Sequence, residues 1–177
     1  MKNAVWGFSL LLLVCIGVVA QAQAPPPGAE AGKLAMFVGN WQYEGAAKAS
    51  PIGPATKISG KQSGRLLVGG FALEFTGEET GALGGVKFGE IDVYDPASKS
   101  YRYLGYQNDG SLWQGSYSFE GNVMKISGTQ TVKGASYWVR GSITFAADGK
   151  SYTQQVDIST DRKTWALWFE LKYTKVS

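Results

Sequence analysis

The chain has 177 residues, a net charge of +3 at neutral pH, 13% aromatic residues and no histidine. The absence of histidine excludes a Ser-His-Asp triad, a histidine-ligated zinc ion and a histidine-ligated haem. Lysines and arginines are scattered along the chain without a dense run. We therefore expect no nucleic-acid partner, because binding a phosphate backbone needs a concentrated positive surface.

The first residues have the layout of a secretory signal peptide. A short positive stretch, Met1–Asn3, is followed by an apolar run that extends to Ala20. Ala20 and Ala22 provide a small-x-small cleavage signal, so we predict a signal peptide over residues 1–22 and cleavage near Ala22. A periplasmic or secreted mature protein without a stable membrane span follows from this interpretation. An uncleaved membrane anchor is the alternative.

A proline-rich linker and a short helix are predicted between this leader and the first strand. Cys15 is the only cysteine and lies inside the apolar run, so the mature chain would contain no disulfide. Residues 23–32 are rich in proline and small residues, which predicts an extended linker. Residues 29–39 can then form about two helical turns, which Gly39 would end.

From Trp41 onward the apolar period changes to two residues, which is typical of strands. Short breaks such as 95–99 and 108–110 are rich in glycine, aspartate, asparagine or proline and predict tight turns. Ten strands are predicted: Trp41–Lys48, Thr56–Val68, Phe71–Glu79, Gly85–Tyr94, Tyr101–Asn108, Ser111–Phe119, Val123–Thr131, Ser136–Ala146, Ser151–Ser159 and Thr164–Thr174.

Short connections between successive strands predict antiparallel neighbours and an up-and-down order. An open sheet of this length would leave two exposed edges, and closure into a barrel removes them. Glycines inside the predicted strands can supply the bends that closure needs. We predict an all-β, up-and-down antiparallel barrel of about ten strands with a short N-terminal helix, as one domain over residues 33–177. A flat sandwich is the alternative.

Alternation along the strands separates an aromatic and aliphatic face from a more polar one. The apolar face is predicted to line the barrel interior, and in the last strand this face includes Trp165. Trp138 and Trp168 fall on the opposite face, where either Leu34 and Phe37 of the N-terminal turn or a partner would cover them. Gln154 shares the apolar face and is either a polar handle in a cavity or a rim residue. The predicted ligand-binding residues are Phe71, Phe75, Trp113, Tyr117, Tyr137, Phe145, Tyr152 and Gln154.

Two acidic residues of the fourth predicted strand form the main candidate for chemistry. Glu90 and Asp92 are two residues apart, so both side chains lie on one face of the strand. Inside an aromatic pocket, such acids would have a raised pKa and could act as acid–base groups. The expected placement is a solvated strand face, although alternation leaves the inward side of this strand ambiguous, and without a visible partner we assign no catalytic role. Arg65 and Arg140 are also expected to point outward.

The opening of the predicted barrel, Gly39-x-Trp41 after a short apolar turn, resembles the calycin group of lipocalins and fatty-acid-binding proteins. In that group the indole plugs one end of the barrel, which implies a structural role for Gly39 and Trp41. Haem-binding nitrobindins are similar in architecture, but they bind iron through a histidine that this chain lacks. No cofactor and no metal are therefore expected. Four segments resemble a bacterial family of calycin-like barrels, domain of unknown function fifteen seventy-nine: 67–78, 89–103, 109–117 and 159–175.

The main functional prediction is an exported, non-enzymatic barrel that binds a small hydrophobic or amphipathic ligand in its interior. One alternative is a barrel filled by its own aromatic side chains, which would act as a protein-interaction module through outward tryptophans. Another is an enzyme that uses carboxylate or tyrosine acid–base chemistry on an apolar substrate. The sequence leaves the ligand, the partner and the oligomeric state open.

Overall fold

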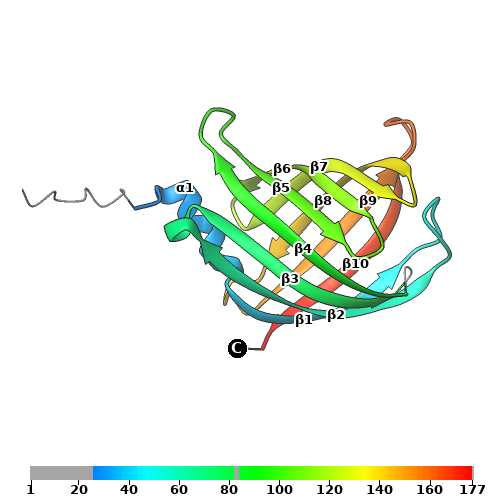
Figure 1. The fold of residues 1–177 in the computed structure, drawn as a ribbon, viewed down its shortest axis with the longest axis horizontal. Coiled ribbons are helices and arrows are strands. Elements are labelled where there is room, and N and C mark those ends of the chain that lie inside the picture. The colour runs from blue at the N-terminus through cyan, green and yellow to red at the C-terminus, as the bar shows by residue number, and fades with distance from the viewer. Residues whose placement is uncertain (1–25, 82–83, 177) are drawn as a thin grey trace, which may run out of the picture.

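A computed structural model describes residues 26–81 and 84–176 of the chain. Within them, a short helical segment precedes ten strands (Figure 1). The predicted signal peptide, residues 1–22, lies outside the described residues and stays a prediction. No helix of the described residues is long and apolar enough to cross a membrane.

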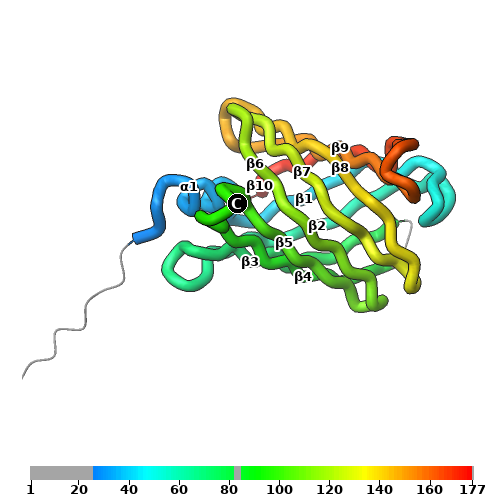
Figure 2. The backbone as a smooth tube through the Cα atoms, turned by 90° about the horizontal axis from the view of Figure 1, so that it is seen from above, coloured from blue at the N-terminus to red at the C-terminus, as the bar shows by residue number. Residues whose placement is uncertain are grey.

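The ten strands form one closed antiparallel barrel, in which each strand pairs with the next and the first pairs with the last (Figures 1 and 2). Because β1 is hydrogen-bonded to both β2 and β10, neither end of the sheet is left open. The predicted up-and-down barrel is confirmed, and the flat sandwich is excluded. The strands are β1 (Gly39–Ala47), β2 (Thr56–Leu67), β3 (Ala72–Gly81), β4 (Gly84–Asp95), β5 (Ser100–Gln107), β6 (Leu112–Glu120), β7 (Val123–Val132), β8 (Ala135–Phe145), β9 (Ser151–Ser159) and β10 (Ala166–Lys175).

The N-terminal helical segment closes one end of the barrel. It consists of α1 (Ala29–Gly32) and the 3-10 helix η1 (Lys33–Phe37), and it ends before Gly39. Leu34 is 0% exposed, because the segment turns its apolar side into the barrel. Gly39 then starts β1 with a φ of 119°, a conformation that glycine adopts without strain.

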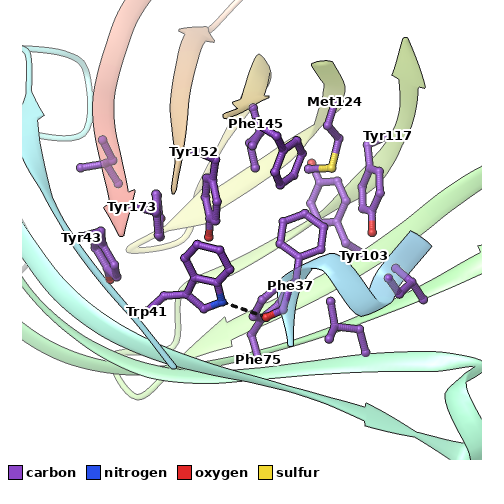
Figure 3. Close-up of a cluster of buried hydrophobic side chains, with 14 of the residues drawn as sticks. Phe37, Trp41, Tyr43, Phe75, Tyr103, Tyr117, Met124, Phe145, Tyr152 and Tyr173 are labelled. Carbon is purple, nitrogen blue, oxygen red and sulfur yellow. Dashed lines mark hydrogen bonds between the residues drawn. The ribbon is translucent and has the colours of Figure 1, made fainter. Parts of the chain in front are cut away.

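Trp41 connects the N-terminal helical segment, which we call the plug, to the first strand. Its indole Nε1 donates a hydrogen bond to the Phe37 carbonyl oxygen at 2.9 Å, drawn as a dashed line in Figure 3. The Phe37 ring meets the rings of Phe75, Phe145 and Tyr152 edge-on, with centroids 5.3–5.9 Å apart. An aromatic cluster therefore fills the plugged end and places a floor beneath the rest of the interior.

The predicted cover of Trp138 and Trp168 by Leu34 and Phe37 is wrong, because both cover residues lie inside the barrel. Trp138 does lie outside, but Arg162 of the β9–β10 connection covers its ring, with the guanidinium carbon 3.2 Å from the ring centroid. Trp168 lines the interior. A register shift between the residues on either side of it in β10 interrupts the alternation on which its outward placement rested.

Trp165 also differs from its predicted inward placement. It precedes the first residue of β10, so it is not subject to strand alternation. Its ring lies 4.4 Å from the guanidinium carbon of Arg140, which pairs with Asp157 at 3.1 Å across exposed side chains. Arg65 likewise pairs with Glu74 on the exposed face. Both arginines therefore point outward, as predicted.

We expect Trp41→Phe to lower the free energy of unfolding by about 2–4 kcal/mol. The substitution removes the indole from a site that is 1% exposed and leaves the Phe37 carbonyl without its buried donor. Trp165→Phe is the matched control, because its Nε1 bonds a backbone oxygen at the surface. It should lower the free energy of unfolding by less than about 1 kcal/mol. Urea denaturation of both variants measures the difference, and equal losses would contradict the plug.

Candidate functional site

The barrel interior contains a partly open cavity of about 220 Å³ above the aromatic floor. All ten strands contribute side chains to its wall, together with Phe37 from the plug and Ile52 from the β1–β2 connection. Most of these side chains are aromatic or aliphatic. The exceptions that carry a carboxyl or amide group are Gln62, Glu79, Glu90, Asp92, Gln107, Gln130 and Gln154.

Five of the eight predicted ligand-binding residues line this cavity: Phe75, Trp113, Tyr117, Tyr152 and Gln154. Gln154 lies on the cavity wall rather than at a rim, and its amide oxygen accepts a hydrogen bond from the Tyr173 hydroxyl at 3.0 Å. Gln62 of β2 also bonds a tyrosine of the wall, but as the donor: its amide nitrogen donates to the Tyr152 hydroxyl at 3.0 Å. Whether these residues bind a ligand stays a prediction.

The other three predicted residues lie elsewhere. Phe71 is 41% exposed because it precedes β3, where strand alternation does not apply. Tyr137 does not line the cavity, and its hydroxyl donates a hydrogen bond to the carbonyl oxygen of Pro51 at 3.5 Å, in the β1–β2 connection. Phe145 is buried in the aromatic floor and packs on Phe37.

Glu90 and Asp92 face the cavity, so the expected solvated placement is wrong. Trp113 of β6 donates an indole hydrogen bond to Glu90 of β4 across the intervening strand β5. In the strand register, Gly105 of β5 lies between them and pairs with both. A side chain at position 105 would occupy the space of the indole ring. Gly105 therefore allows this bond to form.

The same arrangement recurs in the adjacent strands β1, β2 and β3. Tyr43 of β1 donates a hydrogen bond to Glu79 of β3 at 3.1 Å. Gly60 of β2 lies between them in register, and a Cβ atom at Gly60 would collide with the Tyr43 ring. In both places, an aromatic donor crosses a glycine on the middle strand to reach an inward carboxyl. Glycines that the sequence suggests as barrel bends thus also provide space for inward aromatic rings.

Asp92 is the most deeply buried acid of the cavity, with 2% of its surface exposed. Its Oδ2 accepts a hydrogen bond from the Tyr117 hydroxyl at 2.7 Å. Its Oδ1 is buried and has no hydrogen-bond partner among the described residues. The amide oxygen of Gln107, which also lines the cavity, is in the same state. The wall therefore presents acceptor atoms that no described protein group satisfies.

Burial raises the pKa of the carboxyls that line the cavity. This is the main cause for Glu79 and for Glu90, where the hydrogen bonds from Tyr43 and Trp113 act in the opposite direction. The pKa of Asp92 is well above its usual range, because burial is reinforced by the neighbouring charge of Glu90. No lysine or arginine is among the described residues that line the cavity. These acids therefore have no cationic side chain on the cavity wall.

Sequence reasoning missed Glu79, Tyr43 and Tyr103 as cavity residues, although a signal existed for the first of them. Glu79 has the same parity in β3 as Leu73 and Phe75, so strict alternation places it inside. No group of three or more histidine, cysteine, aspartate or glutamate residues in the described part of the chain is arranged to hold a metal ion.

The closed barrel, its plugged end and its internal cavity define a calycin-like protein, as the sequence resemblance predicted. Residues 26–175 match a family described as protein of unknown function, DUF1579, and the chain belongs to this family. No curated protein matches the chain in sequence.

Two solved structures with 12% sequence identity have similar architecture. Rv2717c from M. tuberculosis gives a TM-score of 0.59, with 85% of this chain and 99% of that chain covered. The S-type phycobiliprotein lyase CPES from Guillardia theta gives a TM-score of 0.53 at the same two coverages. At this identity the likeness concerns the fold alone.

We expect the free energy of unfolding to fall as pH rises from about 4 through the raised pKa of Asp92. The folded protein then binds more protons than the unfolded chain, so each retained proton adds up to about 1.4 kcal/mol per pH unit to this slope. Asp92→Asn keeps an oxygen for Tyr117 and should flatten the profile. Asp157→Asn, on the exposed face, should not. Urea denaturation across pH measures the slopes, and an unchanged slope in Asp92→Asn would contradict the expectation.

Proposed function

We propose that the protein binds a small hydrophobic or amphipathic ligand in the cavity inside its barrel. The observation that carries the proposal is the space of about 220 Å³ inside the barrel, with a mainly apolar wall and a few polar groups. Concave apolar space with a small number of placed polar groups is the usual form of a small-molecule site. A barrel filled by its own side chains would leave no such space, because protein interiors are close-packed.

The alternative of an interaction module has less support. It depended on Trp138 and Trp168 as an outward surface, but Trp168 lines the cavity and Arg162 covers the ring of Trp138. We also propose that the protein acts in the periplasm or outside the cell. The support for this is the sequence of residues 1–22, with its positive start, apolar run and small-x-small signal.

A second candidate function is acid–base conversion of the bound molecule. The observation in its favour is the inward placement of Glu90 and Asp92, whose pKa values are raised by burial. A carboxylic acid that keeps its proton closer to neutral pH is a better general acid at that pH. The carrier function needs only the cavity, whereas this one also needs a substrate bond within reach of the acids.

Native mass spectrometry of the full chain purified from its own host tests the proposal. We expect a small molecule that co-purifies with the protein and is released on denaturation. Ile126→Trp should reduce its occupancy at least about tenfold, because the side chain at this position borders the cavity and the larger ring would fill it.

Leu104→Trp is the matched control, since Leu104 is 51% exposed on β5 and its replacement leaves the cavity unchanged. Equal occupancy in the two variants, or protein that always purifies empty, would contradict ligand binding. Release of a molecule chemically altered by wild-type protein but not by Asp92→Asn would favour the enzymatic candidate.

A further inference from the structure

We propose that the ligand of this cavity is a small organic cation, an ammonium group carried on an aromatic or aliphatic body. The inference rests on the proposed ligand-binding function and names its ligand class. Its basis is that Glu79, Glu90 and Asp92 all line one cavity whose described lining residues include no lysine or arginine. Buried carboxyls either keep a proton or are paired with a cation, and within the cavity only a bound molecule can provide the cation.

The unpaired acceptor atoms of the cavity wall favour a ligand that carries hydrogen-bond donors. Asp92 Oδ1 and the amide oxygen of Gln107 are buried acceptors without a partner among the described residues. An ammonium group has donors, no acceptors and a full positive charge, so it would satisfy an unpaired acceptor and offset carboxylate charge together. A purely apolar ligand would leave these atoms unsatisfied.

The aromatic residues of the wall favour the same ligand. Five tyrosines line the cavity from β1, β5, β6, β9 and β10, and Figure 3 labels all of them: Tyr43, Tyr103, Tyr117, Tyr152 and Tyr173. Burial raises the pKa of each phenol, so the rings stay neutral in the physiological range. Neutral aromatic rings attract cations through their electron-rich faces and also cover an apolar body.

Charge disfavours the opposite kind of ligand. An anion would enter a space that already contains three carboxyls and no lining lysine or arginine among the described residues. The size of the cavity limits the cation. A cavity of about 220 Å³ lies below the range of about 300–1,000 Å³ of drug-sized ligand sites, so the cation is small, about one ring with a short side chain.

Three probes with one ring and a two-carbon chain separate the charge from the shape: phenethylamine, phenethyl alcohol and phenylacetate. Isothermal titration calorimetry of the full chain at neutral pH measures their affinities. We expect phenethylamine to bind at least about tenfold more tightly than the alcohol, and phenylacetate to bind most weakly. Equal affinity of amine and alcohol would overturn the cationic ligand and leave the ligand-binding function standing. Binding by none of the probes would also overturn the inference, while native mass spectrometry tests the ligand-binding function separately.

Two variants locate the charge that the amine meets. Glu90→Gln and Glu79→Gln keep an oxygen for Trp113 and Tyr43 respectively, but each removes a carboxylate from the wall. Either should weaken phenethylamine at least about tenfold and change phenethyl alcohol by less than about threefold. Glu78→Gln is the matched control, because Glu78 precedes Glu79 in β3 and pairs with Lys61 on the outer face. Its affinities should be unchanged.

A permanently charged probe, phenyltrimethylammonium, removes titration of the ligand from the measurement. The tyrosines around the acids keep their protons, so any pH dependence of its affinity reports the carboxyls. We expect its affinity to increase as pH rises from about 5 to 8, since the acids then lose protons. An affinity that is flat over this range in wild-type protein, or that Glu90→Gln and Glu79→Gln leave unchanged, would overturn the proposal.

Discussion

Hydrogen bonding between β1 and β10 is the constraint on which the rest of the structure depends. The register runs from Trp41 opposite Lys175 to Ala47 opposite Phe169, so the last strand returns to the first along its length. Once the ribbon is closed, no edge can add another chain, and one face of every strand must look into a shared interior. In this barrel the inward side chains do not fill the interior entirely, and the remaining space is the cavity.

Closure also decides which end of that space is sealed. The helical segment that precedes β1 can reach only the end at which β1 begins, and there Phe37 packs into the aromatic floor under the hydrogen bond from Trp41. The cavity on which the ligand-binding proposal rests lies above this plugged end, and its wall carries the polar groups. Burying three carboxyls costs free energy in a protein interior, and in a filled barrel no bound ligand would offset that cost.

Alternation was sufficient for the architecture but not for every inward residue. It placed Phe75, Tyr117 and Tyr152 correctly, because each lies well inside a regular strand. It failed near interruptions: Phe71 precedes β3, and Trp168 lies at the register shift of β10. At such positions the direction of a side chain depends on the pairing of a neighbouring strand, which a single segment of sequence does not contain.

By itself, the sequence determined the class of the fold, the order of the strands and the apolar character of the interior, since these follow from local period and short turns. Only the tertiary structure decided that Glu90 faces inward and that Trp113 reaches it over Gly105. The physical reason is that this contact joins three strands at positions 90, 105 and 113, and their alignment is set by barrel closure and register. The cavity and its charge are properties of that alignment.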